Sequence, residues 1–106
     1  MVHAQVKLSD IVTRSHLSKD YAYPILSGTR KNPSRDRIIA LCIGAQMSLS
    51  ETQRALEIAK AGILYPKDNR DAALIVCLNE KQYDIIKINA FLESHGLEPL
   101  VTARME

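Results

Sequence analysis

The chain has 106 residues, a length that suits one compact domain, and its net charge of +2 by itself indicates no particular partner. The longest uninterrupted apolar run, residues 72–78, is far shorter than the ~20 residues that a membrane-spanning helix needs. The N-terminal residues also lack the basic and apolar regions of a secretion signal. We therefore expect a cytoplasmic protein that does not associate with a membrane.

The two cysteines, Cys42 and Cys77, lie within apolar segments and show no spacing typical of a metal site. This pattern predicts small buried side chains in a reducing compartment, and neither a disulfide nor a structural metal. No metal or other cofactor is expected.

Charge is distributed unevenly along the chain. Between Arg14 and Arg37, six basic residues stand against two acidic ones, a local net charge of +4. Residues 38–106 carry seven basic and nine acidic residues, a net charge of −2. A basic edge on an otherwise balanced domain is typical of a protein that contacts polyphosphate. The alternative is a basic loop that is only solvated.

The first predicted helix covers residues 6–15. Apolar and small side chains recur there at the spacing that gathers one face of a helix. They are Leu8, Ile11, Val12 and Ser15. A second helix is predicted from Ser18, a good N-cap, to Gly28, which favours the left-handed conformation at a helix end. Only two residues separate the two helices.

A third, central helix is predicted to begin at either Asn32 or Ser34 as its cap. Its residues 38–45 are almost continuously apolar, which is too apolar for a surface helix. Two overlapping capping boxes within residues 48–53 indicate the start of a fourth helix. Gly62 is predicted to close it.

The connection after Gly62 bears a proline and leads to a fifth helix, with Asp68 or Asn69 as its cap. Its apolar run, residues 72–78, would by composition alone also allow a buried strand, but the polar cap and the helical context favour a helix. A sixth helix is predicted over residues 80–94. We identify no internal repeat.

Two helices joined by a tight turn and followed by a basic loop are the parts of a helix-turn-helix, whose second helix enters the major groove of DNA. The segments LSKDYAYPILSG (residues 17–28) and RKNPSRDRIIAL (residues 30–41) carry this arrangement. From Lys7 to about Leu56 the chain resembles the Cro/C1-repressor (XRE-type) helix-turn-helix family, whose G-K-R-N-P-S run appears here as GTRKNPS with one residue inserted. The resemblance covers about half of the chain.

The resemblance implies roles for individual residues. It places Ser18 at the start of the recognition helix, and three side chains of that helix, Lys19, Asp20 and Tyr23, would point outward to base edges. The helical periodicity independently leaves these three positions exposed. Lysine can donate to guanine, aspartate can accept from cytosine, and tyrosine can contact a thymine methyl or a phosphate. For Tyr23, half-buried packing is the alternative.

A second group of side chains would hold DNA phosphates and set the register without reading sequence. It comprises Ser18, Ser27, Thr29, Arg30, Lys31, Ser34 and Arg35. The amide groups at the N-terminus of the third helix would assist them.

Two features depart from the family pattern. The family usually begins with a longer first helix, so the extra helices of residues 70–94 are expected either to replace the missing packing or to form a dimer interface. Pro24 lies inside the recognition helix, where its missing N–H and its ring cost about 3 kcal/mol unless the helix is irregular. Either the helix reads DNA mainly through its first turn, residues 18–23, or the chain no longer reads DNA. We adopt the first interpretation.

The sequence therefore predicts an all-α fold: a compact bundle of five to seven helices that contains a lambda-repressor-like helix-turn-helix. Residues 1–62 would form the DNA-binding region and residues 63–106 a helical extension packed on it, within one domain. The expected function is a transcriptional regulator that binds double-stranded DNA as a homodimer and occupies an operator. The alternative is a helical protein-interaction module, an adaptor or antitoxin-like partner, whose C-terminal helices cover another chain.

Catalysis is not expected. His3, His16 and His95 are scattered along the chain, and the sequence has neither a serine elbow nor a glycine-rich phosphate loop.

Overall fold

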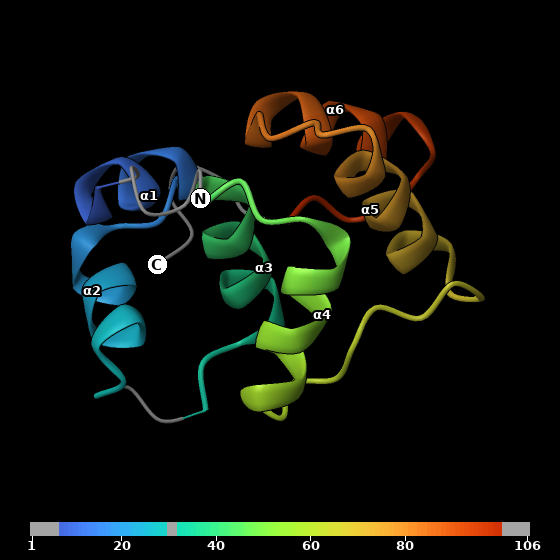
Figure 1. Cartoon of the computed structure of the whole chain (residues 1–106). Coiled ribbons are helices and arrows are strands. Elements are labelled where there is room, and N and C mark those ends of the chain that lie inside the picture. Colours follow the sequence, from blue (N-terminus) through green and yellow to red (C-terminus); the bar gives the residue numbers. More distant parts are fainter. Residues whose placement is uncertain (1–6, 30–31, 101–106) are drawn as a thin grey trace.

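The computed structural model describes residues 7–29 and 32–100, which form six α-helices and no strand (Figure 1). The helices are α1 (Leu8–Ser15), α2 (Lys19–Ser27), α3 (Arg35–Gly44), α4 (Leu49–Ile58), α5 (Asn69–Asn79) and α6 (Ile85–Ser94). The prediction of an all-α bundle of five to seven helices is confirmed. No helix in the described part of the chain is long and apolar enough to cross a membrane. Val6, the expected start of the first helix, lies outside the described residues.

Side-chain caps fix where four of the helices begin. The caps are Ser34 for α3, Ser48 for α4, Asp68 for α5 and Asp84 for α6. Each cap accepts a hydrogen bond from a backbone amide of the first turn, which would otherwise have no partner within the helix. Where the sequence left two candidates, the structure therefore selects Ser34 over Asn32 and Asp68 over Asn69.

The predicted sixth helix, residues 80–94, begins later than expected, at Ile85. Lys81 takes a left-handed conformation, φ 59°, just beyond the end of α5. Asp84 then caps α6 by accepting the amide hydrogen of Ile86 at 2.9 Å. The residues between α5 and α6 therefore form a turn, and α5 and α6 together form a helical hairpin.

The fourth helix ends earlier than expected, at Ile58. Lys60, with φ 56°, takes a left-handed conformation directly after the helix, and Gly62, which was expected to close the helix, follows with φ 91°. The predicted division of the chain after residue 62 thus falls within the connection between α4 and α5.

One hydrophobic core joins all six helices. Every residue from Ile38 to Gly44 is buried, which confirms the predicted central helix, and α1 packs most extensively on it. The C-terminal helices α5 and α6 contribute Leu74, Ile88 and Leu92, which are fully buried, to the same core. They therefore share one core with the N-terminal helices.

Both cysteines, Cys42 and Cys77, are buried and free, as predicted. Burial raises the pKa of the Cys42 thiol to about 11, although a hydrogen bond with Thr52 opposes the shift. Burial also raises the pKa of Cys77. Both thiols are therefore protonated at neutral pH.

An internal repeat, which the sequence pattern did not reveal, relates the hairpin α3–α4 to the hairpin α5–α6. In each, an arginine in the first turn of the first helix donates to two successive carbonyls beyond the second helix. The contacts are Arg35 with Gly62 and Ile63 (3.0 and 2.7 Å), and Arg70 with Glu98 and Pro99 (2.9 and 3.1 Å). A side-chain amide of the second helix bonds to the backbone of a buried leucine in both hairpins. These pairs are Gln53 with Leu64, and Asn89 with Leu100.

Two crossed ion pairs join the hairpins. Arg35 contacts both carboxylate oxygens of Asp71 at 2.9 and 2.7 Å, and Arg70 contacts both oxygens of Asp36 at 3.0 and 2.8 Å. Such bidentate contacts fix geometry as well as charge. Each arginine thus closes its own hairpin and binds the acid of the other one.

The two acids of these ion pairs differ in their surroundings. Asp71 is buried, and it also accepts the amide hydrogen of Tyr65 at 2.9 Å. Burial alone would raise the pKa of Asp71, but the hydrogen bonds from Arg35 and Tyr65 outweigh burial and hold that pKa below its ordinary value. The hydrogen bond with Asp71 likewise raises the pKa of the Arg35 guanidinium.

Candidate nucleic-acid interface

The helices α1 and α2 form the tight pair that the sequence predicted. The buried hydroxyl of Ser15 donates to the carbonyl of Val12 at 2.7 Å and accepts the amide hydrogen of Leu17 at 3.2 Å. His16 between them takes the left-handed conformation, φ 62°. The turn is therefore held by the last residue of α1, and α2 follows directly after Ser18.

The outer face of α2 carries the three residues expected to read bases. Lys19 and Asp20 are exposed in its first turn, and Tyr23 is 37% exposed one turn later, so part of its ring is packed. Ala22 on the opposite face is fully buried. In Figure 1, α5 and α6 lie on the far side of the molecule from α2, so the C-terminal hairpin leaves this face open.

Pro24 lies in the middle of α2, and the helix nevertheless continues to Ser27. The proline supplies no amide hydrogen, but its carbonyl accepts the amide hydrogen of Thr29 at 3.0 Å and the hydroxyl hydrogens of Ser27 and Thr29, each at 3.3 Å. Gly28, with φ 81°, makes this closure possible. Pro24 thus fixes the end of α2, and the three residues that were expected to read bases precede it.

The structure describes four of the hydroxyl-bearing residues that were predicted to bind phosphate. They are Ser18, Ser27, Thr29 and Ser34. Ser27 and Thr29, at and just beyond the end of α2, are exposed, and their hydroxyls lie 3.1 Å apart. Ser34 is exposed and caps α3. The Ser18 hydroxyl occupies the N-cap position of α2 without making a cap hydrogen bond, and it has no partner among the described residues. The Ser18 Oγ atom is itself buried, so it is not exposed to a phosphate in this conformation.

Arg35 requires a correction. We expected it to bind phosphate, but its guanidinium makes four hydrogen bonds, to Asp71 and to the carbonyls of Gly62 and Ile63. Its donors are therefore used within the protein, and it is not part of the interface. Arg30 and Lys31, the other two cations of the predicted group, lie outside the described residues.

Arg37 is a cation next to α2 to which the sequence analysis assigned no role. Its guanidinium carbon lies 4.1 Å from the centre of the Tyr21 ring, so it links α3 to α2 by a cation–π contact. Its Nε has no hydrogen-bond partner in the described part of the chain. In the sequence, the only indication of a role for Arg37 was that it belongs to the basic segment of residues 14–37.

Comparison of the chain with protein-family models, with curated proteins and with solved structures finds no match. Within residues 7–29 and 32–100, no group of three or more His, Cys, Asp or Glu side chains is arranged to hold a metal ion.

Proposed function

We propose that the protein binds double-stranded DNA through α1 and α2, and that it regulates transcription by occupying an operator. The observation that carries the proposal is the outer face of α2. It presents Lys19 and Asp20 in the first turn of a helix that follows a tight turn and that the C-terminal helices leave uncovered. A helix presented in this way fits the major groove of B-DNA.

The first turn of α2 supplies complementary chemistry for base edges. The Lys19 ammonium would donate to the O6 and N7 acceptors of guanine, and the Asp20 carboxylate would accept from the amino group of cytosine. Tyr23, one turn further, would contact a thymine methyl group or a phosphate. Because Pro24 follows all three residues, any irregularity that it causes in α2 lies beyond the proposed contacts.

Phosphate contacts would come from hydroxyls, helix N-termini and cations around α2. Ser34 lies at the N-terminus of α3, where amide groups favour an anion, and the exposed hydroxyls of Ser27 and Thr29 lie at the end of α2. Arg37 lies beside α2, and the basic loop adds Arg30 and Lys31 on the strength of the sequence alone. These contacts would set the register of α2 in the groove.

The resemblance to the XRE-type family supports a homodimer whose two recognition helices lie about 34 Å apart, one helical turn of DNA. A protein-interaction module remains the second candidate, because Ile58, Ile63 and Tyr65 at the end of α4 are 70%, 51% and 56% exposed. A partner chain could cover such apolar side chains.

Fluorescence anisotropy of a labelled random-sequence duplex tests the proposal. We expect binding that weakens by orders of magnitude between about 50 and 200 mM salt, because phosphate contacts release counterions. Absence of binding at low salt would refute the proposal and favour the interaction module.

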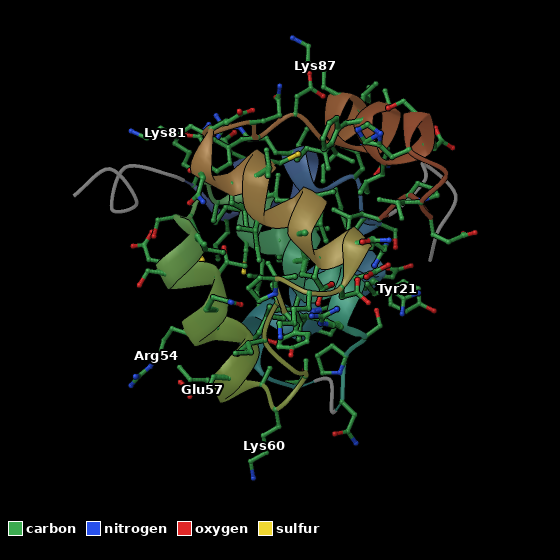
Figure 2. The ribbon with its side chains drawn as sticks, turned by 90° about the vertical axis from the view of Figure 1, so that its right-hand side faces the viewer. Tyr21, Arg54, Glu57, Lys60, Lys81 and Lys87 are labelled. Carbon is green, nitrogen blue, oxygen red and sulfur yellow. The ribbon has the colours of Figure 1, made fainter. Side chains whose placement is uncertain are left out.

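A matched pair of lysine variants then tests the assignment of α2. On a duplex selected from a random pool, Lys19→Ala should cost about 1–3 kcal/mol and relax the preference at one base pair. Lys87→Ala, in the first turn of α6 on the far side of the molecule, should leave affinity and preference unchanged (Figure 2). Equal losses in the two variants would contradict the assignment.

A further inference from the structure

A cavity of about 580 Å³ that is wide open to solvent lies where three helix-to-helix turns meet. It is bounded by the end of α1, the turn from α3 to α4 and the turn from α5 to α6. Its polar lining includes Arg14, His16, Gln46, Lys81, Tyr83 and Asp84. The volume lies within the range of about 300–1,000 Å³ that is typical of small-molecule sites.

Three of the lining residues occupy equivalent positions. His16, Gln46 and Lys81 each follow the end of the first helix of a hairpin in the left-handed conformation, with φ of 62°, 58° and 59°. This conformation favours glycine, and glycine does occupy it at the ends of α2 and α6, as Gly28 and Gly96. In the three turns that line the cavity, this left-handed position carries a polar side chain instead of glycine, although the conformation disfavours any side chain.

The charge of the cavity is predominantly positive. Arg14 and Lys81 are exposed at its rim and form no ion pair with another described residue, and Figure 2 shows Lys81 extending outward from the molecule. Asp84 is the only acid in the lining, and one of its oxygens accepts the amide hydrogen of Ile86 at 2.9 Å as the cap of α6. Two cations therefore face the cavity without a neutralising partner.

We propose that this cavity binds a small molecule that carries an oxyanion, a phosphate or a carboxylate group. Arg14 and Lys81 supply positive charge at the rim, and His16 and Gln46 supply hydrogen-bonding groups from the turns. Tyr83 adds a hydroxyl to the wall.

Ligand binding at this site does not depend on DNA binding. One consequence does rest on the proposed function: His16 lies in the turn that orients α2, so a ligand that restrains this turn would alter the presentation of the recognition helix.

The test uses the full chain labelled with ¹⁵N, without DNA, in amide spectra at constant ionic strength. Sodium pyrophosphate and sodium citrate are titrated separately, so that the two arms distinguish a phosphoryl from a carboxylate ligand. We expect at least one of them to give saturable shifts at the amides of residues 14–16, 46–47 and 81–86. Linear shifts without saturation in both arms, or saturable shifts confined to α2 and the start of α3, would overturn the proposal.

Variants give the second part of the test. Arg14→Gln and Lys81→Gln should each weaken binding about tenfold, because each removes a charged hydrogen-bond donor. Lys60→Gln is the matched control: Lys60 has the same left-handed conformation, φ 56°, at the opposite end of the molecule (Figure 2). If Lys60→Gln weakened binding as much as Lys81→Gln, the assignment of the cavity would be wrong.

Discussion

Replacement of Gly44 by alanine tests how closely α1 approaches α3. A β-carbon at Gly44 would lie 2.5 Å from the carbonyl oxygen of Ile11 and 3.2 Å from the amide nitrogen of Ser15, whereas ordinary contact begins at 3.4 Å. Both atoms belong to the backbone of α1 and cannot rotate away. The whole of α1 would have to move by close to an ångström.

The two energetic effects of Gly44→Ala have opposite signs. Overpacking of a core costs about 1–3 kcal/mol, and an obstruction by backbone places Gly44→Ala at the upper end of that range. Alanine recovers up to about 1 kcal/mol, because it is the better helix former. We therefore expect the free energy of unfolding to fall by about 2 kcal/mol, as measured by urea denaturation followed by circular dichroism.

A second glycine provides the control. Gly62 has φ 91°, and no atom lies within 4 Å of the position that a β-carbon would occupy there, so Gly62→Ala should cost only the left-handed conformation, about 1 kcal/mol. If Gly44→Ala instead stabilised the protein by the amount that helix propensity alone gives, the close approach of α1 and α3 would be refuted.

Two further predictions concern buried ionisable groups. Asp71→Asn should lower the free energy of unfolding by about 3 kcal/mol, because it leaves Arg35 without its charge partner, whereas Asp36→Asn, whose side chain is 28% rather than 7% exposed, should cost about 1 kcal/mol. Urea denaturation of the two variants checks this, and equal losses would contradict it. Because the folded pKa of Cys42 is about 11, stability should fall by up to about 1.4 kcal/mol per pH unit as the pH rises from about 9 to 11. Thermal denaturation across this range should show a shallower fall for Cys42→Ala.

Much of the fold could be predicted because its signals are local. The capping box of Ser48 and Glu51 and the left-handed Gly28 lie where short-range patterns placed them. The start of α6 could not be predicted, because Lys81 ends α5 at a position where the usual signal is a glycine. Residues 80–84 were therefore assigned to the predicted sixth helix, although they form the turn between α5 and α6.

The site was predictable only where it depends on one helix. Helical periodicity correctly predicted that Lys19 and Asp20 are exposed, because the same periodicity places Ala22 on the buried face of the helix. The ion pair of Arg35 with Asp71 could not be predicted, because the two residues are distant in the sequence. Ser18 was expected as a cap and holds that position, but its unpaired hydroxyl depends on packing around it.

The internal repeat was hidden for a chemical reason. The arginine of each hairpin binds main-chain carbonyls, and a carbonyl is the same group whichever residue carries it. Gly62 and Ile63 in one hairpin therefore correspond to Glu98 and Pro99 in the other without any likeness of side chains.

The crossed ion pairs also make the two hairpins depend on each other. Arg35 binds the acid of α5 and Arg70 binds the acid of α3, so the charges of each hairpin are balanced only when the other is in place. Separating the hairpins would expose four unbalanced charges at once, which favours unfolding of both hairpins as one unit.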